Sequence, residues 1–495
     1  MKKYILGIDQ GTTGTRAIIF DQDVNIISSA YSEFTQYFPQ PGWVEHDAME
    51  IYEITLKMMR QAISEAHLKP ENIAGIGITN QRETTVFWDK NTGIPADRAI
   101  VWQDRRTLPI CEALIEKDGP AIEDRTGVTI IPNDSATKIH WQMKNNPEIR
   151  RGVDEGRLIY GTIDSWLTWK LSGGRAHVTD PSNSAVTLLQ NARTLEYDEG
   201  ILSELEIPRS ILPEIRSTSE IYTATDPALF GGVEIPIAGL IGDQQGATLG
   251  QACFEKGMAK NTYGTGCFAM MNTGPTVPVS RSGLLSCVAW SICGETNYCL
   301  EGSVFNAGST VQWMRDELHL ISSAEETQAL AESVPDNGGV YLVSAFTGLG
   351  APYWDMYARG TLIGITRGTT RAHVVRAGLE GIAYQVRDLI DAMEKDAGAP
   401  MQILRVDGGA SVNRFLMQFQ ADVLRCPIDR PVMVETTALG AAFLAGLHAG
   451  VWSNVGDIVR IRESAHIFRP KMDAENAQEL CRRWHKAVER AKDWE

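Results

Sequence analysis

One pattern recurs along the chain: a short apolar run, rich in β-branched residues, enters a glycine-rich polar turn, in three of four cases directly after an acidic residue. It is seen in "ILGIDQGTTG" from residue 5, "PIAGLIGDQQG" from 236, "MAKNTYGTG" from 258 and "ILRVDGGA" from 403. Such runs, bounded by turn residues, are typical of strands. Helix-like segments alternate with them along the chain. The alternation predicts an α/β protein whose functional groups lie at strand ends.

The order of elements in the first half starts again in the second. The first half holds strands at 4–8, 16–20 and 73–79, a helix begun by Asp47, and a strand that leads into a helix over 157–171. The second holds a hairpin over 257–274, a strand, turn and helix over 403–424, and a small-residue helix over 437–450. A chain of 495 residues exceeds the ~250–300 residues at which single cores stop growing. We therefore expect two similar domains, at 1–249 and 250–495.

Charge and composition exclude several classes of protein. Lys and Arg number 46 against 62 Asp and Glu, a net charge of −16, which disfavours nucleic acid as a partner. No apolar run approaches the ~20 residues that span a bilayer, and the run after the two N-terminal lysines breaks at Asp9, unlike a secretory signal. The eight cysteines form no CxxC pair. We expect reduced thiols in a cytoplasmic protein.

The first turn, "DQGTTGT", admits two interpretations. Its glycines, threonine hydroxyls and backbone N–H groups suit phosphate oxygens, with Arg16 adding a positive charge and Asp9 lying where a phosphate-bound Mg²⁺ takes an oxygen ligand. It is equally the pattern of an ordinary hairpin in which an aspartate caps the turn.

The later turns favour the phosphate interpretation. Gly264, Thr265 and Gly266 offer a second phosphate contact, and Gly408 and Gly409 permit close approach of a nucleotide. Several glycine-rich strand exits in one chain indicate one nucleotide bound between two domains. The chain has neither a GxxxxGK[ST] loop nor a GxGxxG turn after a strand, so neither the P-loop nor the Rossmann pattern fits.

An acceptor for phosphate also has candidate ligands. Phosphoryl transfer needs a base for the attacking hydroxyl, and Asp9 and Asp243 are the candidates. Arg82 and Glu83 together can donate to and accept from the hydroxyls of a polyol, although such a dipeptide is commonly a surface charge pair. Trp102 and Phe268 fit either a stacking wall of the pocket or the core.

These residues lie in segments that resemble the FGGY carbohydrate kinase family, and the likeness covers nearly the whole chain. It is greatest to the members that phosphorylate glycerol. The segments are "DQGTT" (9–13), "PGWVEHD" (41–47), "GITNQRETT" (77–85), "AIVWQDRRT" (99–107), "GDQQGA" (242–247), "NTYGTGCF" (261–268), "FTGLGAPYWD" (346–355), "RVDGGA" (405–410) and "NRFLMQFQ" (413–420). The resemblance implies two actin-like, ribonuclease-H-like α/β domains with a cleft between them for ATP, Mg²⁺ and a small polyol.

The family's roles map onto residues of this chain. Asp243 matches the catalytic base, and Asp9 and Asp243 match the acids near Mg²⁺, directly or through water. The nucleotide contacts correspond to Thr12, Thr13, Gly14, Arg16, Thr265, Gly308, Gln312, Gly409 and Asn413. The polyol contacts correspond to Arg82, Glu83, Trp102, Asp243, Gln244 and Phe268. The resemblance also implies a homodimer or homotetramer.

The sequence departs from the family pattern at several positions. Where members that act on glycerol usually read Pro-Tyr-Phe-Ser-Gly-Thr-Lys, residues 132–138 read "PNDSATK", so Asn133 stands in place of a tyrosine that contacts glycerol. Glu220 stands where some relatives carry a phosphorylatable histidine. Glu234 replaces an arginine found in relatives inhibited by fructose 1,6-bisphosphate.

The expected activity is ATP-dependent phosphorylation of glycerol to glycerol 3-phosphate, with Asp243 as the general base. One alternative is a kinase for another small polyol or ketose, such as erythritol or dihydroxyacetone, which Asn133 keeps open. An alternative of another class is an actin-like ATPase or sensor. Such an ATPase has no use for the hydroxyl-binding residues of "QRE" and "GDQQ".

Overall fold

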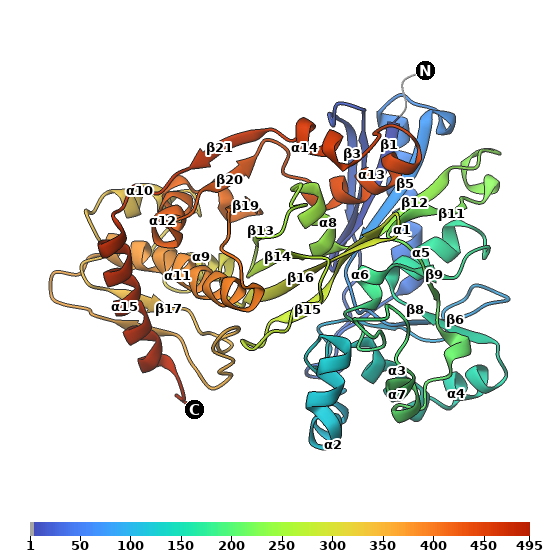
Figure 1. The fold of residues 1–495 in the computed structure, drawn as a ribbon, viewed down its shortest axis with the longest axis horizontal. Coiled ribbons are helices and arrows are strands. Elements are labelled where there is room, and N and C mark those ends of the chain that lie inside the picture. Colours follow the sequence, from blue (N-terminus) through green and yellow to red (C-terminus); the bar gives the residue numbers. More distant parts are fainter. Residues whose placement is uncertain (1–3) are drawn as a thin grey trace.

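The computed structural model describes residues 4–495, so Lys2 and Lys3 lie outside it. Its centre is a sheet of 13 strands in the order β21-β20-β19-β13-β14-β16-β15-β11-β12-β5-β1-β2-β3 (Figure 1). The strands have the bounds β1 Tyr4–Gln10, β2 Gly14–Phe20, β3 Ile26–Glu33, β5 Ile73–Asn80, β11 Ser219–Ala224, β12 Pro236–Gly242, β13 Met258–Tyr263, β14 Cys267–Gly274, β15 Leu285–Ile292, β16 Glu295–Val304, β19 Ile403–Asp407, β20 Ile428–Pro431 and β21 Ser464–Phe468.

The sheet consists of two copies of one topology. In the first, β1, β2 and β3 pair antiparallel, β1, β5 and β12 pair parallel, and β11 runs antiparallel to β12. In the second, β13, β14 and β16 pair antiparallel, β13, β19 and β20 pair parallel, and β21 runs antiparallel to β20. The copies join where Ser219 of β11 pairs with Ile292 of β15. The predicted two-domain α/β fold is therefore confirmed.

Helices and four small two-stranded sheets surround this sheet. The helices are α1 Ala48–Glu65, α2 Leu108–Thr126, α3 Ser135–Asn145, α4 Pro147–Asp154, α5 Ile163–Leu171, α6 Pro181–Ser184, α7 Glu199–Glu204, α8 Asp243–Gly250, α9 Gly308–Asp316, α10 Glu326–Glu332, α11 Arg371–Ala397, α12 Arg414–Leu424, α13 Thr436–His448, α14 Val455–Ile461 and α15 Ala474–Ala491. The small sheets pair β4 Glu45–His46 with β7 Ala99–Ile100, β6 Val86–Asp89 with β8 Leu158–Gly161, β9 Val178–Thr179 with β10 Glu214–Ile215, and β17 Tyr341–Val343 with β18 Thr361–Ile363.

Helix α1 shows why these sequences form these elements. Asp47 caps it as predicted, since its Oδ1 accepts from the backbone N–H of Met49 at 2.8 Å, which satisfies a donor that the first turn leaves free. Ile51 and Met59 lie on one face of the helix and are fully buried. They belong to the hydrophobic core that includes Ile8 of β1 and Ile78 of β5.

Helix α13 ties the two halves together. It lies late in the chain, yet it packs on β1, β5 and β12 of the first copy and against α8 (Figure 1). Glycines allow this close approach, because a Cβ at Gly77 would meet the carbonyl oxygen of Ala441 at 1.9 Å and one at Gly440 would meet that of Gly246 at 2.0 Å. The halves are thus interlocked through this helix.

Two expectations from composition also have structural outcomes. Among residues 4–495, no helix is both long enough and apolar enough to cross a membrane. All eight cysteines are free thiols, and Cys293 alone is exposed.

Candidate active site

Three parallel strands deliver the predicted polar residues to one edge of the sheet. In the register of β1, β5 and β12, Gln10 pairs with Asn80, which pairs with Gly242. Asp9 therefore lies beside the exit of β1, Arg82 follows β5 by two residues, and Asp243 follows β12 directly. Segments far apart in the sequence converge here because carboxyl ends of parallel strands share an edge.

Arg82 is the centre of the cluster. Its Nη1 and Nη2 donate to the two carboxylate oxygens of Glu301 on β16, each at 2.6 Å, and its Nε lies 3.3 Å from Oδ1 of Asp243. Gln245 adds an acceptor at 3.3 Å from Nη1. The Arg82 side chain is 9% exposed, so the alternative of a surface charge pair is wrong. A bidentate pair in this setting fixes the guanidinium plane.

Glu83 carries a carboxylate without a hydrogen-bond partner among the described residues. It is buried, with a left-handed backbone (φ 62°), and neither carboxylate oxygen has a hydrogen bond within the region the structure describes. Burial raises its pKa to about 7, and the nearby Arg82 and Lys138 oppose that rise. A buried carboxylate with free lone pairs suits the hydroxyl groups of a ligand.

Asp243 and Gln244 begin α8. Oδ1 of Asp243 accepts from the backbone N–H of Gln244 at 2.7 Å. Burial raises the pKa of Asp243, and Arg82 and Lys260 act against this rise. Lys260 is fully buried, and its Nζ donates to Oε1 of Gln244 and, at 3.1 Å, to Oγ1 of Thr262.

The second copy of the sheet supplies the opposite side of the cluster. Across β13, β14 and β16, Lys260, Met270 and Glu301 form one row, and Thr262, Phe268 and Ser303 form the next. Side chains two residues apart on a strand share a face, so Phe268 lies on the face that carries Lys260 and Glu301. Its ring is half-buried, as a wall of a pocket requires.

The first turn is a tight hairpin. The N–H of Gly11 donates to the carbonyl of Gly14 at 2.9 Å, and Trp102 donates through Nε1 to Oγ1 of Thr12 at 2.9 Å. Thr13 is exposed, so its hydroxyl is open to a ligand. The half-buried Trp102 connects the hairpin to the segment that follows β7.

Arg16 and Asp9 face each other across β1 and β2. Arg16 forms an ion pair with Glu435, the residue before α13. Burial raises the pKa of Asp9 to about 7, assisted by the charges of Asp243 and Glu435 and opposed by Arg16. Carboxylates that destabilise one another in this way match the oxygen ligands that Mg²⁺ prefers. Within residues 4–495, however, no three acidic, histidine or cysteine side chains form a ready-made metal cage.

The second glycine turn packs against the start of α9. The N–H of Gly308 donates to the carbonyl of Gly264 at 2.9 Å, and a Cβ at Gly308 would meet that oxygen at 2.6 Å. Thr265 is exposed beside it, as is Gln312 one turn further along α9. The predicted residues Thr265, Gly308 and Gln312 therefore belong to one local surface.

The third turn follows β19. Gly409 is exposed, and a Cβ there would meet nothing within 4 Å, which leaves space for a ligand. Asn413 caps α12 by accepting from the N–H of Leu416 at 3.0 Å, and its Nδ2 donates to Oγ1 of Thr327 at 2.9 Å. Asn413 thus has a structural role of its own beside the predicted nucleotide contact.

Asn133 lies close to the Glu83 side of the cluster. Its backbone carbonyl accepts from Nζ of Lys138, the fully buried lysine whose charge acts on Glu83. Its half-buried side chain makes no hydrogen bond to any described residue. Asp134 is also buried, and burial raises its pKa well above the usual range. The departure at 133–134 therefore places polar groups near Glu83.

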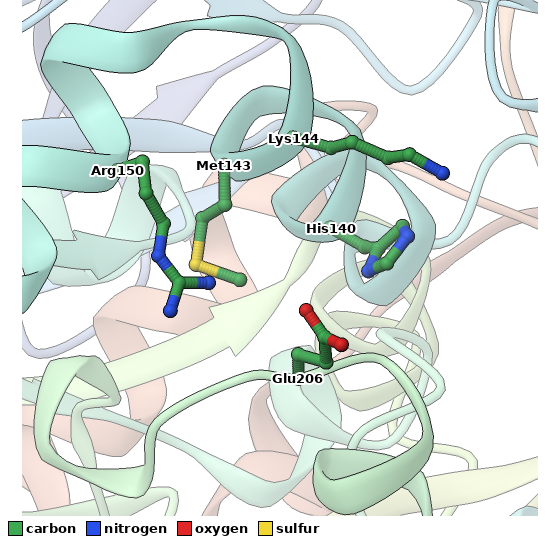
Figure 2. Close-up of a pocket in the computed structure, with 5 residues that line it drawn as sticks. All are labelled: His140, Met143, Lys144, Arg150 and Glu206. Atoms are coloured by element: carbon green, nitrogen blue, oxygen red, sulfur yellow. The ribbon is translucent and has the colours of Figure 1, made fainter.

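The two positions predicted to lack regulation carry ion pairs. Glu220 pairs with Arg216, and Glu234 lies 2.7 Å from Arg175. A separate surface pocket, with a volume of about 180 Å³, lies away from these positions; Figure 2 shows the side chains that line it. Its lining comes from α3, α4 and the segment after α7, and consists of His140, Met143, Lys144, Arg150 and Glu206. None of these residues belongs to the strand-end cluster.

Comparison with known proteins decides the family. Residues 4–250 match the N-terminal domain and residues 259–449 the C-terminal domain of the FGGY family of carbohydrate kinases. The chain belongs to the FGGY family of carbohydrate kinases. The kinase class and the family expected from the sequence are confirmed.

Two proteins named as glycerol kinases resemble the chain over its full length. It is 55% identical to "Glycerol kinase 2" of Thermotoga maritima, over 100% of this chain and 99% of that protein. It is 54% identical to "Glycerol kinase" of Petrotoga mobilis with the same coverage.

Solved structures of other kinases share the fold. The Plasmodium falciparum glycerol kinase with ADP superposes with a TM-score of 0.94 at 38% identity, covering 99% of this chain and 98% of that one. The xylulose kinase of Lactobacillus acidophilus has a TM-score of 0.88 at 21% identity, covering 98% and 97%, which shows the fold alone.

Sequence reasoning missed four charged residues of this FGGY kinase that contact the site residues or shift their pKa values: Glu301, Lys260, Lys138 and Glu435. A signal existed for two of them: Lys260 and Glu301 interrupt apolar strand segments in "GMAKNTY" and "YCLEGSV". Buried charges in strands are rare unless paired. Their partners across the cluster, Gln244 and Arg82, however, lie 16 and 219 positions away in the sequence.

Proposed function

We propose that the protein phosphorylates glycerol at the expense of ATP, giving glycerol 3-phosphate and ADP. The observation that carries this proposal is the cluster of Arg82, Glu83, Asp243 and Gln244 beside the glycine hairpin of residues 11–14. Full-length likeness to proteins named glycerol kinase supports glycerol as the acceptor.

The cluster offers complementary groups to a polyol. Glu83 and Asp243 supply acceptors for hydroxyl protons, while Arg82 supplies donors for hydroxyl oxygens. The pairing of Arg82 with Glu301 fixes these donors before the substrate arrives, so little ordering cost remains at binding. Trp102 and Phe268 present apolar surfaces for the carbon chain.

Asp243 is the proposed general base. The attacking hydroxyl oxygen forms a bond to the γ-phosphorus, the bond from that phosphorus to the β,γ-bridging oxygen breaks, and ADP leaves. The hydroxyl proton passes to the carboxylate of Asp243. Burial raises the pKa of Asp243, which increases its basicity toward a hydroxyl, and Arg82 favours the charged form needed to accept the proton.

Nucleotide phosphates would lie on the hairpin, against Thr12, Thr13, Gly14 and Arg16, with Thr265, Gly308, Gln312, Gly409 and Asn413 along the second copy of the sheet. Asp9 and Asp243 would hold Mg²⁺, directly or through water. The raised pKa of Asp9, to which burial and the charge of Asp243 contribute, supports this fit, because a divalent cation would relieve that repulsion. The metal neutralises phosphate charge in transfer reactions.

This arrangement also supports the proposed division into domains 1–249 and 250–495, with nucleotide and polyol bound between them. Glu83, Arg82 and Asp243 come from the first, and Phe268, Lys260 and Glu301 from the second. Closure of one against the other would keep water from competing with the polyol for the phosphoryl group.

The direct test is ³¹P NMR of the purified protein with ATP, Mg²⁺ and one acceptor at a time. Formation of glycerol 3-phosphate, with kcat/KM at least tenfold above that for erythritol and dihydroxyacetone, is expected. A higher kcat/KM for erythritol or dihydroxyacetone would show that this compound, and not glycerol, is the preferred acceptor. ATP hydrolysis that is independent of any acceptor would instead support an actin-like ATPase.

A further inference from the structure

Lys260 is a buried cation that the reaction described above does not use. Its side chain is fully buried in the second copy of the sheet, and burial lowers its pKa, while Asp407, Glu301 and Asp243 counteract that effect. Burying an ammonium group is costly unless it is paired and hydrogen-bonded. Its partners therefore indicate what it is for.

The ammonium group has two close partners. Nζ donates to Oε1 of Gln244 at the start of α8 and to Oγ1 of Thr262, two residues along on the same face of β13. An ammonium group has no acceptor, so the Gln244 atom facing it is the carbonyl oxygen. This contact fixes which way the amide of Gln244 points.

The amide nitrogen of Gln244 consequently faces away from Lys260. Within residues 4–495, Nε2 of Gln244 donates to no protein group. The residue is half-buried and adjoins Asp243. The neighbouring Gln245, by contrast, directs its Nε2 to the backbone carbonyls of Ser182 and Val288. Gln244 is the glutamine left with free donors at the cluster.

We infer that Lys260 is a positioning residue for the acceptor: by holding Oε1 of Gln244, it aims the Nε2 donors at a hydroxyl oxygen of the polyol. The inference rests on the proposed polyol kinase function. It assigns Gln244 a donor role beside the acceptors Glu83 and Asp243. The site then recognises a hydroxyl group through both its oxygen and its proton.

The inference predicts that Lys260 and Gln244 act as one unit. Without Lys260 the amide can turn and present its oxygen, so the loss of Lys260 removes the same hydrogen bond as the loss of Gln244. We expect Lys260→Met and Gln244→Leu each to raise the KM for glycerol about tenfold or more, with a smaller effect on kcat. The KM of the double variant for glycerol should exceed the KM of the weaker-binding single variant by no more than about threefold.

The experiment is a double-mutant cycle on the full-length protein, with KM and kcat for glycerol, ATP affinity by calorimetry and Tm measured for each variant. Wild-type turnover of glycerol establishes the underlying function separately. KM effects that multiply in the double variant would overturn the inference, as would a Lys260→Met variant with unchanged KM. A defect confined to Tm would show that Lys260 serves folding alone and would also overturn it.

Gln244→Glu keeps the test valid if Lys260→Met does not fold. The carboxylate has nearly the same shape and retains a partner for Lys260, so the fold is expected to persist. It carries no N–H donor, and the KM for glycerol should rise about tenfold or more. A KM within about twofold of wild type would overturn the assigned donor role.

Discussion

Arg82 and Glu301 form a two-point ion pair, with both distances at 2.6 Å, across 219 positions of sequence and between the two copies of the sheet. The pair joins the edge that carries Asp243 to the face that carries Phe268. It is almost fully buried, the side chains being 9% and 5% exposed. The polyol site and the contact between the two sheets therefore depend on the same interaction.

Glu301→Gln is predicted to damage both stability and acceptor binding. Breaking a buried ion pair on one side costs about 3–5 kcal/mol, because the remaining charge is left without compensation. Tm should fall clearly, and the KM for glycerol should rise about tenfold or more as Arg82 turns toward Asp243. Thermal melts and steady-state kinetics measure the two effects.

The matched control is Glu489→Gln, which breaks the more exposed pair with Lys492. Exposed pairs contribute little, so neither Tm nor KM should change measurably. Equal effects of the two substitutions would contradict the role given to the Arg82–Glu301 pair.

Acceptor binding is predicted to strengthen as the pH rises through about 7. Burial raises the pKa of Glu83 to about 7, so the folded protein holds the proton at a pH where an exposed glutamate has lost it. The ionised form offers both oxygens as hydrogen-bond acceptors for hydroxyl groups, whereas protonation turns one of them into a donor; the ionised fraction grows with pH. The KM for glycerol should fall between pH 6 and 8, and Glu83→Gln should remove this dependence of KM on pH. If the dependence persists in Glu83→Gln, another group is responsible for it.

Glu435 is predicted to compete with ATP for Arg16. The two side chains form an ion pair at the hairpin proposed to receive phosphates, so an anionic ligand must share or displace Glu435. Glu435→Gln should therefore tighten ATP binding by about two- to fivefold, the upper part of the range for one partly exposed ion pair. Calorimetric titration of ATP measures this, and weaker binding by the variant would contradict it.

Asn133 tests how the departure from the family pattern affects the acceptor. Its side chain has no protein partner among the described residues, and its carbonyl accepts from Lys138 beside Glu83. A tyrosine there would add a ring to pack on the carbon chain of glycerol. Asn133→Tyr should lower the KM for glycerol with little change in kcat. If no acceptor responds to the substitution, Asn133 does not line the pocket.

The fold could be read from the sequence to a large extent, because local patterns carry it. The cap at Asp47, the hairpin of residues 5–20 and the strand that ends at Gly242 all follow from neighbouring residues. The sequence did not predict that α13 would cover the first sheet, because the contact of Gly77 with Ala441 joins residues 364 positions apart in the printed sequence.

Some residues of the candidate site could likewise be predicted from the sequence and others could not. Residues at strand exits, such as Asp9 and Asp243, could be proposed from their place in the pattern. Glu301 and Lys260 could not, because a charged residue within a strand has meaning only through the register of β13, β14 and β16. Pairing between distant strands is set by the whole fold rather than by a local signal.

The most direct test of the account is the turnover of Asp243→Asn at saturating glycerol, with ATP affinity measured in parallel. Asparagine keeps the size of the side chain but cannot take the hydroxyl proton. Removal of a general base costs about 10²–10⁴-fold, so kcat should fall by at least 10²-fold while ATP still binds with an affinity within a few-fold of wild type. A variant with nearly normal kcat would contradict the assignment of Asp243 as the base.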